Sequence, residues 1–304
     1  MLGLFGLLGA LFAGVMADSM ISVSKGDDDP ADTDGDDQDG TDDSARTLDL
    51  LNPADGSDGA MQTIDDTDGA VISDDLDDPS PEDQWLTGDD DADILQGAGG
   101  NDTLTGNGGD DLIDGGDGQD SLEGGAGADV IHAGGGDDLV LGGAGEDTLH
   151  GEDGDDQING GDGADALFGH EGDDTLQGGD GADQLIGGGG NDVAAGDAGE
   201  DWLAGGFGDD TLTGGSGSDT LDGNAGNDVI WGQTAGQSDA DTDFLNGGTG
   251  DDSLWLGAGD YGTGGDGADD FGLIDTAAGD APVQICDFNP DQDHLVVLYD
   301  AHLH

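Results

Sequence analysis

Basic residues are almost absent from this chain of 304 residues, which has two Lys and Arg residues (Lys25 and Arg46) against 74 Asp and Glu residues. The formal charge of −72 leaves no basic surface that could release counterions from phosphates, so nucleic acid is excluded as a partner. Anionic membrane surfaces would repel the chain as well. Because such a charge opposes compact folding, the chain is either disordered or neutralised by bound cations.

Cysteine, aromatic residues and catalytic motifs are also scarce. Cys286 is the only cysteine, so no intrachain disulfide can form. A bound metal is the obvious alternative means of stabilising the fold. His170-Glu171 is not followed by the second His of a zinc-protease helix, and Lys25 follows Ser24 instead of the Gly of a phosphate-binding loop. No stretch outside the repeats described next is large and apolar enough for an active-site domain. The sequence therefore predicts a protein that is not an enzyme.

Glycine and aspartate are abundant instead, and they recur with a period of nine residues. Sixteen consecutive units run from Gly88 to Trp231, with Gly at positions one and four, Asp at position six and a large aliphatic residue at position eight. The exceptions at the glycine and aliphatic positions are Ala133, Asp91 and Ala194. A disordered chain has no reason to keep such a phase, so the repeats predict an ordered structure.

The unit itself suggests a tight turn over its first six residues and a short strand over its last three, with the aliphatic residue inward. Two units of nine residues would then complete one coil, which places Asp111 over Asp93 and Asp120 over Asp102. Coils should be separated by ~4.8 Å, the spacing of strands in a sheet. Carboxylates that close cannot all stay ionised without a cation between them.

Carboxylate and carbonyl oxygens at sites of flexible geometry suit Ca²⁺, whereas Zn²⁺ prefers His and Cys. The sequence therefore predicts several calcium ions, held by the Asp at position six of each unit and, after the regular array, by three further Asp residues in phase. The candidate ligands are Asp93, Asp102, Asp111, Asp120, Asp129, Asp138, Asp147, Asp156, Asp165, Asp174, Asp183, Asp192, Asp201, Asp210, Asp219, Asp228, Asp243, Asp252 and Asp269.

The consensus Gly-Gly-x-Gly-x-Asp-x-aliphatic-x, seen cleanly in residues 142–150, resembles the RTX (repeats-in-toxin) nonapeptide of hemolysin-type calcium-binding proteins. The resemblance covers about half of the chain. It implies an all-β fold, a right-handed parallel β-roll or β-solenoid with Ca²⁺ bound in the turns. It also implies export from a Gram-negative bacterium, and assigns the ligand role to the position-six Asp residues.

The chain divides into four predicted regions. Residues 1–17 contain an apolar run, 2–16, that suits either a cleaved signal peptide or a retained membrane or cell-surface anchor. Residues 18–84 are rich in Asp, Gly, Ser and Pro and predict a disordered acidic linker. Residues 85–272 form the β-roll, with the stretch 233–243 bulging as a loop and 256–263 irregular. Residues 273–304 predict a C-terminal cap, in which strands at 282–288 and 294–299 pair as a β-hairpin.

Three minor patterns accompany the repeats. His132 and His150 share position nine two units apart and should stack, most simply as part of an outward-facing ladder and with a transition-metal site as the less favoured alternative. Outward Trp202, Trp231 and Trp255 support neighbouring strands or form a docking surface. The acids at position five are expected to be solvated turn charges.

These patterns predict a secreted or cell-surface calcium-binding protein whose roll folds when Ca²⁺ binds, since a ligand that binds only the folded state favours folding. Two alternatives stay open. One is a surface adhesin or surface-layer spacer that is anchored by its N-terminus, and the other is the calcium-dependent tail of a secreted hydrolase. The protein partner is not apparent from the sequence.

Overall fold

The computed structural model describes residues 62–63, 71–72, 83–233, 241–274 and 281–297, and its regular secondary structure there is entirely β. The predictions for residues 1–17 and for most of 18–84 concern residues outside this described part of the chain. The strands are β1 (Gln62–Thr63), β2 (Val71–Ile72), β3 (Trp85–Thr87), β4 (Ile94–Gly99), β5 (Thr103–Gly108), β6 (Leu112–Asp117), β7 (Ser121–Ala126), β8 (Val130–Gly135), β9 (Leu139–Ala144), β10 (Thr148–Asp153), β11 (Gln157–Asp162), β12 (Ala166–Glu171), β13 (Thr175–Asp180), β14 (Gln184–Gly189), β15 (Val193–Ala198), β16 (Trp202–Phe207), β17 (Thr211–Ser216), β18 (Thr220–Ala225), β19 (Val229–Gln233), β20 (Phe244–Thr249), β21 (Ser253–Leu256), β22 (Tyr261–Asp266), β23 (Asp270–Leu273), β24 (Gln284–Ile285) and β25 (His294–Val297).

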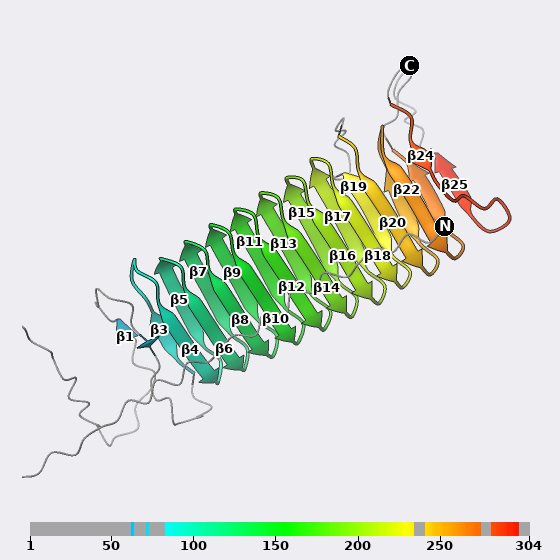
Figure 1. Ribbon diagram of the computed structural model, residues 1–304. Coiled ribbons are helices and arrows are strands. Elements are labelled where there is room, and N and C mark those ends of the chain that lie inside the picture. The colour runs from blue at the N-terminus through cyan, green and yellow to red at the C-terminus, as the bar shows by residue number, and fades with distance from the viewer. Residues whose placement is uncertain (1–61, 64–70, 73–82, 234–240, 275–280, 298–304) are drawn as a thin grey trace, which may run out of the picture. The chain divides into compact units, whose positions relative to one another are not determined.

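Consecutive strands alternate between two parallel sheets, so that two strands complete one coil (Figure 1). The odd-numbered strands form a 13-stranded sheet and the even-numbered strands a 12-stranded sheet. Leu149 of β10 lies beside Leu167 of β12, which is two repeat units further along the chain, and the same register holds between coils throughout the regular array. The predicted parallel β-solenoid with two repeat units in each coil is thereby confirmed.

Strands β4 to β18 are six residues long instead of the predicted three. They run from position seven of one unit to position three of the next, as in β10, and the turn is confined to positions four to six. Positions six, eight and one point inward, which is the period of two that a strand requires. Position two carries a left-handed φ even within the strand, 118° at Gly143 and 81° at Glu152. Glycine therefore serves the strand as well as the turn.

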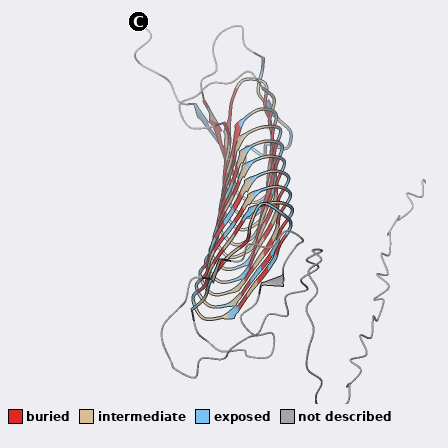
Figure 2. Ribbon diagram, turned by 90° about the vertical axis from the view of Figure 1, so that its left-hand side faces the viewer, coloured by how far each residue is buried: buried red, intermediate tan, exposed pale blue. Residues whose placement is uncertain are grey.

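The core is a row of aliphatic side chains from each sheet, and Figure 2 shows the buried residues repeating from coil to coil. Leu149, Leu167 and Leu185 of the even-numbered sheet are completely buried. Val140 belongs to the corresponding row of the odd-numbered sheet. Even Ala194, the one small residue at position eight, is 1% exposed, so the rows are continuous. This core is narrow, because each coil contributes about one large side chain from each sheet.

Two irregularities change the number of residues in a coil, but both sheets continue through them. Thr220 of β18 pairs with Phe244 of β20, which lies more than two repeat units further along the chain. The predicted loop at 233–243 stays a prediction, because most of that stretch lies outside the described residues. The stretch 256–263, in contrast, is not irregular throughout. Its residues 261–263 begin β22, and Leu256 fills the core beside Gly262, where a Cβ would lie 2.8 Å from a Leu256 methyl carbon.

The predicted C-terminal hairpin is wrong. β24 pairs with β22 in the even-numbered sheet and β25 pairs with β23 in the odd-numbered sheet, both in parallel. The two strands therefore continue the solenoid as a further coil, which saturates the hydrogen-bonding edges left by β22 and β23. Residues 289–293 form the connection between the two sheets.

At the other end, the solenoid begins earlier than predicted. β1 and β2 lie inside the segment expected to be a linker, yet their backbones pair in parallel with β3 and β4. Residue 85, where the predicted β-roll begins, is therefore not in the first layer of the solenoid. Each sheet gains one short strand before the regular array, and this covers the backbone edges of β3 and β4.

Candidate metal centre

The candidate ligands form two continuous rows, one at each line of turns. The backbone N–H of Asp138 donates to Oδ1 of Asp156 at 2.8 Å, and the N–H of Asp156 donates to Oδ1 of Asp174 at 2.9 Å. The same bond repeats along both rows. One row contains Asp93, Asp111, Asp129, Asp147, Asp165, Asp183, Asp201, Asp219, Asp243 and Asp260. The other contains Asp102, Asp120, Asp138, Asp156, Asp174, Asp192, Asp210, Asp228, Asp252, Asp269 and Asp293.

All 19 predicted residues fall within these rows, which we call the Asp rows. Each of the 19 is buried, at 4% exposure or less. Burial follows from position six facing inward, just before the inward aliphatic residue at position eight. The structure thus confirms the predicted stacking, and it adds a hydrogen bond that the repeat pattern did not indicate.

Sequence reasoning missed Asp260 and Asp293. Asp260 accepts the N–H of Asp243 at 3.1 Å and is 1% exposed, and Asp293 accepts the N–H of Asp269 at 3.3 Å. Asp260 follows Asp252 by eight residues instead of nine, and Gly262 replaces the aliphatic residue that should mark its unit. The available signal was the spacing of nine between Asp260 and Asp269.

In most residues of the Asp rows the second carboxylate oxygen, Oδ2, is buried. Among the described residues, Oδ2 is buried without a hydrogen-bond partner in Asp102, Asp111, Asp120, Asp129, Asp138, Asp147, Asp156, Asp165, Asp174, Asp183, Asp192, Asp201, Asp210, Asp228 and Asp252. A buried carboxylate oxygen without a donor is costly. These atoms are therefore the strongest local indication of a missing positive partner.

Glycine at position one makes room for this oxygen. A Cβ on Gly160 would overlap Oδ2 of Asp165 and would lie 2.7 Å from the carbonyl oxygen of Gly178 in the next coil. The φ of Gly160 is not in the left-handed region, so the need for glycine here is one of space. Position one is therefore a cradle in which a carboxylate and a backbone carbonyl approach each other.

Glycine at position four is needed for the backbone conformation of the turn. Gly163 has a φ of 152°, and a Cβ there would overlap the carbonyl oxygen of Gly145 in the preceding coil and lie 3.2 Å from Oδ1 of Asp165. The turns thus bring carbonyl oxygens of successive coils beside the carboxylates of the Asp rows. Every donor in this set is an oxygen atom, which is the donor set that a hard cation such as Ca²⁺ prefers.

The electrostatics of the Asp rows favour either protons or cations. Burial raises the pKa of the Asp156 carboxyl from 3.8 to about 7, and the charges of Asp138 and Asp174 in the same row raise it further. The N–H of Asp138 acts against this rise, because it stabilises the carboxylate. Burial likewise raises the pKa of Asp210 to about 7. Ionised carboxylates in these rows consequently need a positive charge nearby.

A second set of hydrogen bonds runs along the outside of the turns. Asp137 accepts the N–H of Asp155 at 3.2 Å, and Asp155 accepts the N–H of Asp173 at 2.9 Å. These position-five side chains are exposed, as predicted, but they also join one coil to the next. Their bonds run in the opposite direction to those of the Asp rows, because here the earlier coil accepts.

Fold and site together define a β-roll, a parallel solenoid whose turns carry oxygen donors beside buried carboxylates. Residues 87–230 match the sequence model of the RTX calcium-binding nonapeptide repeat (4 copies). Residues 87–230 are therefore calcium-binding nonapeptide repeats of the RTX type. No curated protein matches the chain.

The cradle at position one leads to a test by substitution. We expect Gly160→Ala to lower the free energy of unfolding of the calcium-loaded chain by about 1–3 kcal/mol, the usual cost of overpacking, because its Cβ would displace Oδ2 of Asp165. Gly135→Ala is the matched control, since a Cβ there would meet its nearest atom, Oδ1 of Asp117, at an ordinary 3.7 Å. Denaturant unfolding at saturating calcium measures both. Equal stability of the two variants would show that position one does not need glycine to make room for the carboxylate.

Proposed function

We propose that the 19 predicted Asp residues, together with backbone carbonyls of the turns, bind Ca²⁺ ions whose binding drives the folding of the roll. The observation that carries this proposal is the buried Oδ2 without a hydrogen-bond partner, repeated along both Asp rows. The membership of residues 87–230 in a calcium-binding repeat family supports it. Asp260, which lies in the same row as Asp243, joins the proposed ligands.

Charge explains why folding should depend on the ion. The chain has 74 acidic and two basic Lys and Arg residues, so internal ion pairs cannot balance the Asp rows. Without a cation, desolvation and repulsion act against bringing the carboxylates together. An ion that binds only the folded roll stabilises it increasingly as its concentration exceeds the dissociation constant. The narrow core makes this contribution a large share of the stability.

We further propose a non-enzymatic protein that works outside the cell, either secreted or attached to the cell surface. Extracellular calcium at millimolar levels would saturate sites that remain empty where calcium is scarce. Within the part of the chain that the structure describes, no helix is long and apolar enough to cross a membrane. Attachment through residues 2–16 stays a prediction, because that run lies outside the described residues.

Removal of calcium tests the folding proposal. We expect the far-UV circular dichroism of the calcium-loaded chain at neutral pH to show strands, and an excess of chelator to abolish that signal reversibly. Magnesium serves as the control, because its strict octahedral geometry and slow dehydration suit a carbonyl-rich turn poorly. Restoration by calcium but not by an equal concentration of magnesium is the expected result. A strand signal unchanged by the chelator would refute calcium-driven folding.

A further inference from the structure

A cluster of imidazoles and one carboxylate lies on the outer face of the even-numbered sheet, away from the Asp rows. His132 of β8 and His150 of β10 stack, with ring centroids 4.6 Å apart and planes 1° from parallel. Glu152 Oε1 lies 3.2 Å from Nδ1 of His132, and Nε2 of His170 on β12 lies 3.0 Å from Nδ1 of His150. Potential ligand atoms of His132, His150 and Glu152 all lie within 4.8 Å of one another.

The cluster follows from the register of the coils. His132 and His150 pair at position nine, whereas Glu152 and His170 pair at position two of the following unit. Each position-two side chain reaches back to the His of the preceding coil. Three adjacent coils therefore contribute to one group, and the sequence shows it only when the repeats are wound into coils.

We propose that His132, His150 and Glu152 bind one transition-metal ion, with Zn²⁺ as the representative species, and that His170 orients His150. Two imidazoles and a carboxylate form a common three-residue zinc ligand set, which leaves the fourth position to water. Imidazole donors also distinguish this site from the oxygen-lined turns, because nitrogen ligands favour Zn²⁺, Cu²⁺ or Ni²⁺ over Ca²⁺. His170 takes the role of the second hydrogen-bond partner that metal-binding His residues usually have.

The stacked rings must adjust when the ion binds. The lone pair of an imidazole nitrogen lies in the ring plane, so two parallel rings 4.6 Å apart cannot both direct a nitrogen at one ion. Rotation of the His132 ring about χ2 solves this at little cost and leaves the contact between His150 and His170 in place, since that torsion is broad in His. The rings are free to turn because the cluster lies at the surface, where the side chains of His132 and Glu152 are 41% and 46% exposed.

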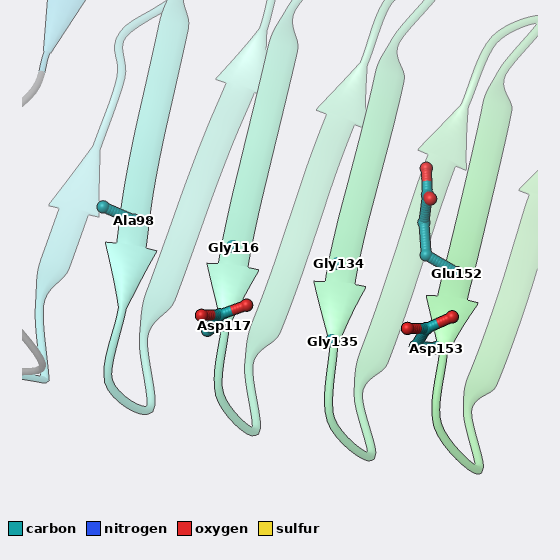
Figure 3. Close-up of a pocket in the computed structure, with 7 residues that line it drawn as sticks. All are labelled: Ala98, Gly116, Asp117, Gly134, Gly135, Glu152 and Asp153. Carbon is teal, nitrogen blue, oxygen red and sulfur yellow. The ribbon is translucent and has the colours of Figure 1, made fainter. Parts of the chain in front are cut away.

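Two features of the surroundings favour a cation here. An open depression lies beside the cluster and is lined by Glu152, Gly134, Asp117 and Asp153 (Figure 3). The Glu152 side chain is half-exposed, so its carboxylate is accessible to solvent. The acidic chain also concentrates cations around the site.

Zinc binding by the calcium-saturated full chain tests the proposal. Saturating calcium occupies the Asp rows and keeps them from competing. His302→Gln and His304→Gln are introduced first, because the terminal His-x-His is a second potential binder in the sequence. We expect this background to bind one Zn²⁺ in competition with a chromophoric chelator. Co²⁺ in its place should give the visible absorption of a four-coordinate site with nitrogen ligands.

Variants in that background distinguish the cluster from adventitious binding. His150→Gln or Glu152→Gln should abolish the stoichiometric site, and His170→Gln should weaken it about tenfold, the lower range for loss of an orienting partner. His294→Gln is the matched control, since His294 is exposed and pairs with Asp270 at 3.2 Å outside the cluster. Unchanged circular dichroism confirms that each variant is folded. Equal zinc affinity in the background and in His150→Gln, or no zinc binding by the background, would overturn the proposal.

Discussion

Acid should fold the calcium-free chain. At about pH 5 we expect strand circular dichroism without calcium, and at about pH 8 we expect its loss. Burial raises the pKa of Asp102 and Asp138 to about 6 and that of Asp156 to about 7, against 3.8 for the free side chain. A raised pKa in the folded state means that the roll takes up protons on folding. Its stability is then complete below pH ~4 and is lost as the pH rises through 6 to 7.

The summed free energy of these pKa shifts decides whether acid alone can fold the calcium-free chain. A shift of one pKa unit corresponds to about 1.4 kcal/mol, and solvent at the turns reduces what each carboxyl contributes. Even on the order of 1 kcal/mol for each shifted carboxyl, summed over the Asp rows, matches the whole net stability of an ordinary domain, ~5–15 kcal/mol. Protonation alone can therefore replace the cation, although it neutralises the carboxylates without cross-linking them to the turn carbonyls.

Calcium titrations at several pH values complete the test. Protons compete for the same carboxylates, so the calcium affinity should fall as the pH decreases below about 7. In saturating calcium the folded fraction should stay high from about pH 8 to pH 6, where the metal-free chain changes most. A calcium-free chain that is equally unfolded at about pH 5 and pH 8 would show that repulsion within the Asp rows is not what keeps it open.

Removing charge from one Asp row should have opposite effects with and without calcium. We expect the triple variant Asp138→Asn, Asp156→Asn and Asp174→Asn to lose calcium stoichiometry and most of its calcium-linked stabilisation. Without calcium it should be more stable than the parent, because Asn keeps the Oδ1 acceptor and removes three buried charges. Calorimetric calcium titration and denaturant unfolding, each with and without chelator, measure both effects.

The position-five residues offer a matched control for charge. Asp137→Asn, Asp155→Asn and Asp173→Asn remove the same three charges from the same coils and also keep the Oδ1 acceptor. Because these side chains are exposed, we expect a calcium affinity within about a factor of ten of the parent, the scale of screened charges at a surface. If both triple variants responded alike, net charge and not ligation would explain the effect of calcium.

Much of the site was predictable because the repeat is so regular. A period of nine with one inward aliphatic residue implies two strands in each coil, and this stacks Asp156 on Asp138 and Asp174. Winding the same pattern predicts that His132 and His150 lie side by side, which their ring stacking confirms. The return of the repeat register after residue 233 was predictable too, because Asp243 and Leu245 restore the phase.

The failures have a common physical origin. The hairpin at 282–299 was inferred from two apolar runs joined by a turn, and such runs pair equally well with whichever edges are free. The edges of β22 and β23 were free, so both segments extended the solenoid. Asp260 was missed because Gly262 stands where its unit should have an inward aliphatic residue. The side chain of Leu256 fills that part of the core instead. Strand length was underestimated because glycine at positions one and two is typical of turns, although both positions belong to the strands.

The sequence by itself determined the class of fold, the coil of two repeat units and the identity of 19 Asp residues of the rows, because each depends only on period and inward direction. Only the tertiary structure decided which carboxylate oxygen accepts a hydrogen bond, since the donation from an N–H of the preceding coil to Oδ1 and the burial of Oδ2 exist only between coils. It also brought Glu152 to His132 and His170 to His150, because residues so far apart in the chain become neighbours only once the coils are stacked.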